Sequence, residues 1–239
     1  MTTLLIATRN AHKVGEIRAI LGNAFQFHTL DDFSAAPKVV EDAETFAGNA
    51  TKKAVELSKW LASKPINDQP STINYILADD SGLEVDVLNG APGVHSARFA
   101  ALDQNENAPD ADNNAKLLRL LKNVSPEKCT ARFRCVIALT PVLKSETTNT
   151  SSVCYADELE LATQIFDGAC EGKIISTPRG PNGFGYDPLF VPDGFDATFA
   201  ELGEDEKNQL SHRAKALDKL KKFFNSKASK LSQSPGKTL

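Results

Sequence analysis

Two adjacent carboxylates, Asp79 and Asp80, follow the short apolar run 75–78 and precede a Ser-Gly pair. The pattern predicts a buried strand that ends at the aspartates, with a tight turn after it. Because neighbouring strand residues point to opposite faces, only one of these carboxylates is expected to face a given cleft. Carboxylate oxygens suit Mg²⁺, which proteins commonly hold with one or two carboxylates plus substrate phosphates. A turn with no other role explains the pair equally well.

A second acidic group is formed by Glu41, Asp42 and Glu44, which come just before a helix expected over residues 45–62. One of them is a candidate for a further ligand of a hard metal ion. Acidic side chains also favour a helix N-terminus, because the helix dipole is positive there. Both interpretations stay open.

Lys53 lies within the apolar stripe of that expected helix, three residues after Ala50 and four before Leu57. A lysine in such a place either extends its ammonium group to solvent or meets a buried anion. Extension to solvent is the more common explanation. A phosphate group of a ligand is the alternative.

The segment 8–13, with the sequence TRNAHK, separates a short apolar strand from an amphipathic helix. Backbone amides at the start of a helix favour an anion, and Thr8 and Lys13 add side-chain donors. The segment is not a P-loop, because the pattern G-x-x-x-x-G-K-[ST] is absent. Capping of the helix by Thr8 or Asn10, with a solvated Lys13, is the simpler interpretation of this segment alone.

The segment 183–217 joins a glycine-rich aromatic loop, GFGYDPLFVPDG, to EKNQLSHRAKAL, which places Ser211, His212 and Arg213 at the start of an amphipathic helix. A flexible aromatic loop beside donor-rich side chains can stack a planar base and read its edge. A loop that merely connects two elements, followed by a capped surface helix, is the alternative.

Composition limits the possible functions. The chain has 239 residues, a formal net charge of −4 and four cysteines. An acidic balance argues against broad nucleic-acid binding, which needs a basic face. Cysteines without a C-x-x-C pair are typical of reduced thiols in a cytosolic protein. The chain shows neither a signal-peptide pattern nor an apolar stretch long enough for a bilayer, so we expect a cytoplasmic protein that binds no membrane.

The order of the expected elements predicts an α/β fold with a mixed sheet, because helices and strands alternate early and a hairpin comes late. The hairpin is expected to consist of a strand over 131–139, a loop over 144–152 and a returning strand over 158–166. Residues 1–224 show no composition break and are expected to form one domain. Residues 225–239 are polar and are expected to be a disordered tail.

The spacing of the remaining polar residues argues against two kinds of catalytic centre. Four histidines without H-x-x-H spacing argue against zinc. No Ser-His-Asp or Cys-His arrangement suggests itself. Phosphate donors, hard carboxylates and a loop able to read a base remain, and together they predict a Mg²⁺-dependent enzyme that acts on nucleotides.

Five segments, in order, resemble the inosine triphosphate pyrophosphatase family, the XTP/dITP diphosphatases: TRNAHKVGEI, ETFAGNATKKA, ADDSGLEVDVLNGAPGVHSARFA, PRGPNGFGYDPLF and EKNQLSHRAKAL. The resemblance implies Mg²⁺-dependent hydrolysis of non-standard purine nucleoside triphosphates (ITP, dITP and XTP) to the monophosphate and pyrophosphate. It also implies a homodimer and an elongated two-lobed fold around a mixed twisted sheet, with the active site in the cleft between the lobes.

The resemblance also gives roles to individual residues. Asp80 matches the general base and metal ligand, Ser81 a substrate contact and Lys53 the lysine of the second helix. The acidic run around Glu41 aligns loosely, so Glu41 and its neighbours stay alternatives for the second metal ligand. The implied phosphate-binding residues are Thr8, Arg9, Asn10, Ala11, His12 and Lys13, and the implied base-binding residues are Phe184, Gly185, Tyr186, Asp187, Lys207, His212 and Arg213.

Two residues depart from the family's pattern, and two rival functions remain. Arg9 stands where many bacterial members have glycine, and Ala100 also replaces a glycine. A Maf-type pyrimidine nucleotide pyrophosphatase has a serine- and arginine-rich N-terminal loop, whereas this chain has T-x-N-x-x-K. A nucleotide-binding regulatory module without turnover is disfavoured by the Asp79-Asp80 pair, because a sensor needs no general base.

Overall fold

One mixed sheet organises the computed structural model, which describes residues 1–64, 73–104, 106–143 and 155–232. Six strands in this part of the chain lie in the order β2-β1-β3-β4-β5-β6. β1 is parallel to β2 and β3, and the other neighbours are antiparallel. The strands are β1 (Thr2–Ile6), β2 (Phe25–Thr29), β3 (Ile73–Val85), β4 (Thr130–Pro141), β5 (Gln164–Ile174) and β6 (Phe190–Pro192). The mixed α/β fold expected from the sequence is confirmed.

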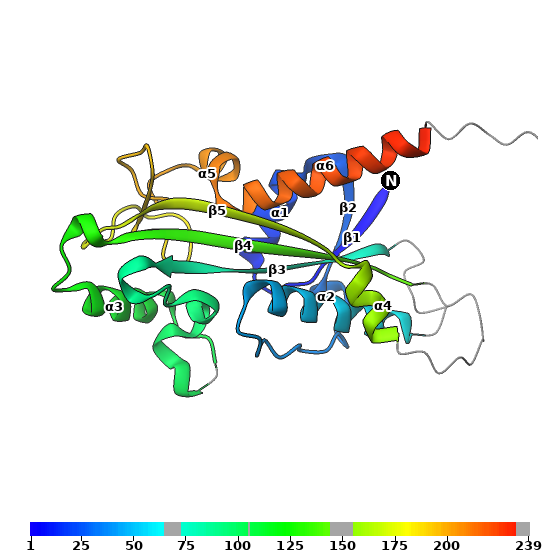
Figure 1. The fold of residues 1–239 in the computed structure, drawn as a ribbon, viewed down its shortest axis with the longest axis horizontal. Coiled ribbons are helices and arrows are strands. Elements are labelled where there is room, and N and C mark those ends of the chain that lie inside the picture. Colours follow the sequence, from blue (N-terminus) through cyan, green and yellow to red (C-terminus); the bar gives the residue numbers. More distant parts are fainter. Residues whose placement is uncertain (65–72, 105, 144–154, 233–239) are drawn as a thin grey trace, which may run out of the picture.

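Helices cover both faces of this sheet at the end where β1 and β2 lie (Figure 1). The α-helices are α1 (Ala11–Leu21), α2 (Phe46–Ala62), α3 (Asp110–Leu121), α4 (Tyr155–Ala162), α5 (Glu204–Leu210) and α6 (His212–Ser232), and η5 (Gly93–Gln104) is a run of 3-10 turns. In the figure α2 and α4 lie on one face, and α1 and α6 lie on the other. The long strands β3, β4 and β5 continue past these helices to the far end, where α3 and η5 pack.

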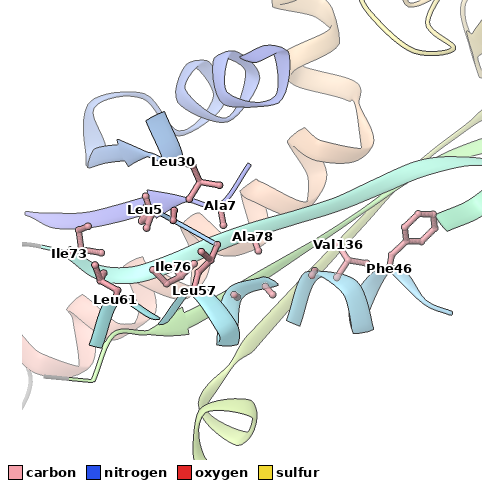
Figure 2. Packing of buried hydrophobic residues seen from close by; sticks show 14 residues of the cluster. Leu5, Ala7, Leu30, Phe46, Leu57, Leu61, Ile73, Ile76, Ala78 and Val136 are labelled. Atoms are coloured by element: carbon pink, nitrogen blue, oxygen red, sulfur yellow. The ribbon is translucent and has the colours of Figure 1, made fainter. Parts of the chain in front are cut away.

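In the part of the chain that the structure describes, the buried apolar residues form three clusters, which explain the elongated shape. Two clusters lie at the β1 end, one beneath α2 and one beneath α1 and α6, and the third lies at the far end beside α3. The first contains Leu5, Leu57 and Ile76 (Figure 2), the second Ile17, Ile137 and Leu217, and the third Leu117, Phe133 and Phe190. The expected two-lobed arrangement follows, with the long strands shared by both lobes.

Two helix caps fix the start of the helices that carry the candidate lysines. The Asn10 side chain accepts a hydrogen bond from the Lys13 backbone N–H at 3.1 Å, which caps α1. Thr45 Oγ1 accepts from the Gly48 N–H at 3.0 Å, which caps α2. Gly22 ends α1 with a φ of 61°, a conformation that glycine adopts without steric cost.

The expected end of a strand at Asp79 and Asp80 is wrong. β3 continues through both residues to Val85 and is paired with β4 from Tyr75 to that end. The Ser-Gly pair forms no turn, because both residues pair with β4. Gly82 lets η5 approach the strand closely. A Cβ atom on Gly82 would lie 2.4 Å from Ser96 Oγ. The two carboxylates therefore lie in the middle of a long buried strand.

Two further expectations are wrong. Residues 158–162 belong to α4, and β5 begins only at Gln164. Glu and Leu alternate over residues 158–161, which is a strand-like pattern, but both residue types are strong helix formers. The tail expected to be disordered from residue 225 is helical to Ser232, because a helix already packed on the sheet propagates into a polar continuation. The predicted loop 144–152 and residues 233–239 lie outside the described residues.

The described cysteines fit the expectation of reduced thiols. Cys129, Cys135 and Cys170 are buried and unbridged, and Cys154 lies outside the described residues. In the described part of the chain, no helix combines the length and apolarity needed to cross a membrane.

Substitution of Gly168 on β5 should displace the start of α6. A Cβ atom there would lie 2.1 Å from the His212 carbonyl oxygen and 2.6 Å from the Ala216 nitrogen, so a backbone shift is unavoidable. We expect Gly168→Ala to lower the free energy of unfolding by about 1–3 kcal/mol. Urea unfolding measures it. Gly15→Ala on α1 is the matched control, because nothing lies within 4 Å of its Cβ position, and it should stabilise by about 0.5–1 kcal/mol. Equal stability of both variants would contradict the close packing of α6 on β5.

Candidate active site

Asp79 and Asp80 are neighbours on β3, but their side chains contact different elements. Asp79 pairs with Lys13 of α1 and Arg213 of α6. Asp80 lies near Lys53 of α2, with 3.9 Å between Oδ1 and Nζ. Because α2 covers one face of the sheet while α1 and α6 cover the other (Figure 1), the two carboxylates face opposite sides, as the strand period predicted.

Asp79 is enclosed by donors. Arg213 Nε donates to its Oδ2 at 2.9 Å, and Lys13 Nζ and Ser81 Oγ donate to its Oδ1. Cys135 Sγ donates to Oδ2 at 3.1 Å. Burial raises the pKa of this carboxyl, but the Arg213 guanidinium and the Lys13 ammonium outweigh it and hold the pKa well below its usual range. Asp79 is therefore a permanent anion that orients its neighbours and is poorly suited to accept a proton.

The ion pairs continue from Arg213 to the aromatic loop. Glu16 of α1 accepts from Arg213 Nη1 and, at 2.8 Å, from Lys207 Nζ. Lys207 Nζ also donates to Asp187 Oδ2 at 2.6 Å. Three cations and three carboxylates thus alternate in one ion-pair chain: Lys13, Asp79, Arg213, Glu16, Lys207 and Asp187.

Burial makes this ion-pair chain costly to break. Arg213 and Asp79 are each 1% exposed, and loss of one member of such a pair typically costs 3–5 kcal/mol because its partner stays charged. Burial raises the pKa of Glu16, but Arg213 and Lys207 outweigh it and lower the pKa below its usual value. For Asp187 burial dominates, and its pKa is raised despite the Lys207 ammonium. The ion-pair chain therefore fixes α1, α5, α6 and the aromatic loop relative to β3.

Asp80 has no comparable set of donors. It is 7% exposed, and its Oδ2 has no hydrogen-bond partner among the residues that the structure describes. Burial raises the pKa of this carboxyl to about 6, although the Lys53 and Lys13 ammonium groups lower it. A general base works best with a pKa near the operating pH. The general-base role that the family resemblance implies for Asp80 stays a prediction.

Lys53 lies inside the protein beside Asp80. It is 8% exposed, so extension of its ammonium group to solvent is excluded. Its Nζ donates to the Asp79 carbonyl oxygen at 2.6 Å and to Glu41 Oε2 at 3.0 Å. Arg98 of η5 donates to the Glu41 carbonyl oxygen at 3.2 Å and holds this acidic segment in place. Glu41 and Asp80 therefore flank one cation.

No cluster of three His, Cys, Asp or Glu side chains suited to a metal ion occurs in the described part of the chain. The pair Asp80 and Glu41 nevertheless fits Mg²⁺, because proteins commonly supply it with only one or two carboxylates. The unpartnered Oδ2 atom of Asp80 has lone pairs for such an ion.

The N-terminal loop serves the start of α1. Thr8 Oγ1 accepts from the Asn10 N–H at 3.2 Å, and Asn10 caps the helix. The capping interpretation is therefore confirmed for Asn10. The solvated Lys13 of that interpretation is wrong, because its Nζ pairs with Asp79. The opposing charge of Asp79 raises the pKa of Lys13 against the effect of burial, so Lys13 is a cation at neutral pH.

The other residues implied for phosphate binding divide into two groups. Arg9 donates to the Ala36 carbonyl oxygen at 3.1 Å, and Ala11 is exposed in the first turn of α1. The imidazole of His12 instead stacks on the ring of Phe184, with 5.2 Å between ring centres and 14° between planes. The first turn of α1 thus contacts the aromatic loop.

The aromatic loop is held by α3. The Gly185 N–H donates to Asp110 Oδ2 at 2.6 Å, and the Gly185 carbonyl oxygen accepts from Asn114 Nδ2 at 3.0 Å. Glycine suits this position because its φ is 63°. The Phe184 N–H donates to Asp187 Oδ2 at 2.9 Å, which joins the loop to the ion-pair chain.

The side chains of Tyr186, which belongs to this loop, and of His212 at the start of α6 are both buried. Tyr186 is 3% exposed and donates its hydroxyl to the Ser96 carbonyl oxygen at 2.9 Å. His212 stacks on Phe133 with 4.9 Å between ring centres. Burial and the nearby cations of the ion-pair chain hold the pKa of His212 well below its usual value, so the imidazole is neutral. Its Nδ1 atom has no hydrogen-bond partner among the described residues.

Sequence reasoning missed several residues that build the site. Glu16 lies three residues after Lys13. This spacing puts both residues on the same side of α1, and it could have indicated that Glu16 belongs to the site. Asp110 and Asn114 gave no signal, because their contacts with Gly185 span more than 70 positions. The sequence placed Cys135 in an alternating strand but did not indicate its contact with Asp79.

Two surface cavities of about 410 and 400 Å³ lie beside β5, and none of the predicted site residues lines either one.

Most of the chain is similar in sequence and in structure to known proteins. The dITP/XTP pyrophosphatase of Geobacter sulfurreducens is 45% identical over 223 residues, which is 92% of this chain and 96% of that protein. The dITP/XTP pyrophosphatase of Desulforamulus reducens is 42% identical over 223 residues, 93% of this chain and 95% of that protein. The solved HAM1 protein of Coxiella burnetii has a TM-score of 0.73 at 34% identity, with 95% of this chain and all of that chain covered.

The fold and the site define an α/β protein whose polar residues gather around two adjacent aspartates of one long strand. The chain belongs to the Ham1 family, whose model matches residues 4–223.

Asp80→Asn should stabilise the protein at neutral pH. The folded-state pKa of about 6 lies above the usual value of 3.8. Ionisation of this carboxyl therefore lowers the free energy of unfolding at pH values above 3.8, and the full cost is present above about pH 6. Two pKa units correspond to about 3 kcal/mol. We expect the gain in the free energy of unfolding at pH 7.5 to fall as the pH is lowered through 6 and to vanish near pH 3.5. Urea titrations in EDTA at several pH values measure it. A pH-independent difference between the variants would contradict the raised pKa.

Proposed function

We propose that this chain is a nucleoside triphosphate pyrophosphatase. It hydrolyses dITP, XTP and ITP to the nucleoside monophosphate and pyrophosphate and so clears deaminated purines from the nucleotide pool. Membership of the Ham1 family supports this, as does more than 40% identity to relatives named dITP/XTP pyrophosphatases.

The observation that carries the proposal is the unequal environment of two adjacent aspartates. Asp79 is neutralised by Arg213 and Lys13, whereas the Oδ2 atom of Asp80 has no hydrogen-bond partner in the described residues. A buried carboxylate oxygen rarely lacks a hydrogen-bond partner in native proteins, and exceptions point to function. An enzyme needs such a group, and a binding module does not.

Mg²⁺ fits beside Asp80, with Glu41 as the second carboxylate and substrate phosphates completing its ligands. When bound, a divalent cation polarises phosphoryl oxygens and offsets the charge of a triphosphate. Lys53, whose Nζ lies 3.0 Å from Glu41 Oε2, adds a fixed positive charge at the same place.

Asp80 is the residue that moves a proton in the proposed reaction. Ionised above about pH 6, it accepts a proton from a water molecule as the water oxygen bonds to the α-phosphorus. The bond from the α-phosphorus to the bridging oxygen breaks, and pyrophosphate leaves with that oxygen. Lys13, Lys53 and the backbone amides of the first turn of α1 offset the negative charge. Phosphoryl transfer needs little covalent help, so positioning and charge neutralisation supply the catalysis.

Base selection is assigned to the aromatic loop and its buried neighbours. Phe184 offers a ring for stacking, and Lys207 Nζ lies 4.7 Å from the centre of that ring. A donor in this place bonds to the 6-keto oxygen of hypoxanthine or xanthine. Adenine presents an amino donor there, which would leave both donors unpaired in a dry site. Sites built on such hydrogen bonds reject a mismatched analogue far more strongly than apolar shape does.

Pyrophosphate release from ITP, dITP and XTP tests the proposal. We expect turnover with Mg²⁺ and none in EDTA. Asp80→Asn should lower kcat about 10²–10⁴-fold, the usual contribution of a general base, with little change in nucleotide affinity. Asp167→Asn is the matched control, since this aspartate is exposed on β5 and pairs with Lys219. Full turnover in EDTA, or no release from any of the three nucleotides, would contradict the proposal.

Two variants separate stacking from recognition of the base edge. His212→Ala should lower kcat/KM for ITP more than for ATP, because only the ITP complex loses a matched hydrogen bond worth about 0.5–1.5 kcal/mol. Phe184→Ala should lower both alike, because stacking on a ring does not distinguish the two bases. Side-by-side kcat/KM values measure the effect. Equal losses for both nucleotides in the His212 variant would remove this residue from base recognition.

Three further features stay predictions: the homodimer implied by the resemblance, the cytoplasmic location, and the absence of nucleic-acid binding. Light scattering on the purified chain tests the homodimer.

A further inference from the structure

His12 adjoins the residue that the proposed function assigns to base stacking, so the inference made here rests on that function. Its imidazole lies nearly parallel to the Phe184 ring, at 14° and with 5.2 Å between centres. Such geometry is a favourable aromatic contact. A side chain expected to bind phosphate therefore covers the ring expected to bind the base.

The two partners of this stack differ in how firmly they are held. Phe184 is anchored by its N–H, which donates to Asp187, and by the next residue, Gly185, whose two backbone polar groups bond to α3. His12 is exposed in the first turn of α1. These hydrogen bonds fix the loop backbone that carries Phe184, whereas the exposed imidazole of His12 has room to turn toward solvent.

The spacing of the rings leaves no room for a third ring. A purine between His12 and Phe184 would make two stacking contacts of about 3.5 Å each, so the ring planes would stand about 7 Å apart. The observed distance of 5.2 Å between centres is shorter than that. The face of Phe184 that His12 covers is also the face toward α1, and the next residue of α1, Lys13, reaches the phosphate end of the site at Asp79. On this geometry, a nucleotide that reaches from Lys13 to Phe184 meets the face that His12 covers.

We propose that His12 is a placeholder for the purine: its imidazole covers the stacking face of Phe184 in the free protein, and the base of the nucleotide displaces it. The placeholder shields an aromatic ring from water while the site is empty. It also lowers the affinity for every ligand that carries a base, because the His12–Phe184 contact is lost on binding. It leaves the affinity for a ligand made of phosphate alone unchanged.

Calorimetric titration with the two reaction products tests this without turnover. Inosine 5′-monophosphate carries the base, and inorganic pyrophosphate does not. An aromatic contact of this kind corresponds to about a two- to tenfold change in affinity. We expect His12→Ala to bind the monophosphate more tightly by that factor and His12→Phe, with a stronger stacking ring, to bind it more weakly. Pyrophosphate should bind all three proteins equally. His28→Ala is the matched control, because it removes a histidine–phenylalanine contact with Phe33 outside the site.

The sign of the effect decides between the possible roles of His12. Weaker binding by His12→Ala together with tighter binding by His12→Phe would show that His12 stacks on the bound base and would overturn the placeholder. Unchanged monophosphate binding in both variants would overturn it as well, and so would a parallel change in pyrophosphate binding. Failure of the wild-type protein to bind the monophosphate would overturn the proposed base site together with this inference. Normal binding without an effect of His12 would overturn the inference alone.

Discussion

The buried ion pair between Arg213 and Asp79 is the interaction on which the rest of the site depends. The two residues are 134 positions apart in the chain and meet only when α6 packs on the face of the sheet opposite α2. Arg213 also pairs with Glu16, which in turn holds Lys207. A buried guanidinium without its carboxylates would be severely destabilising. Correct docking of α6 therefore fixes the position of Lys207 beside the aromatic loop.

The same geometry leaves Asp80 different from its neighbour. The strand period turns Asp80 to the α2 face, away from Arg213, where Lys53 is shared with Glu41. One carboxylate is thereby held as an anion and the other keeps a pKa of about 6. Two adjacent residues of the same type acquire different chemistry because they face different layers of one fold.

Local patterns in the sequence predicted the elements whose signals are local. The cap at Asn10, the apolar stripe of α2 and the alternation of β4 all required only neighbouring residues. The opposite orientation of Asp79 and Asp80 followed from strand geometry alone.

The features that sequence reasoning missed depend on contacts between distant segments. β3 continues past Asp80 because its pairing with β4 continues, and neither this pairing nor the approach of η5 to Gly82 has a local signal in the sequence. The sequence left open whether the Lys53 ammonium group extends to solvent or meets an anion. The structure places Glu41 and the Asp79 carbonyl oxygen beside it. The stack of His12 on Phe184 joins segments more than 170 positions apart. The resemblance to a family implied a set of site residues but not which of them pair with one another.

The most direct measurement of the central claim is a ¹³C NMR titration of the carboxyl groups of Asp79 and Asp80 in metal-free protein. The different environments of the two aspartates predict that Asp80 titrates near pH 6 and that Asp79 stays ionised to the lowest pH at which the protein is folded. Addition of Mg²⁺ should move the Asp80 titration to lower pH and leave Asp79 unchanged. Titration of Asp80 near pH 4, or of Asp79 near neutrality, would contradict the account.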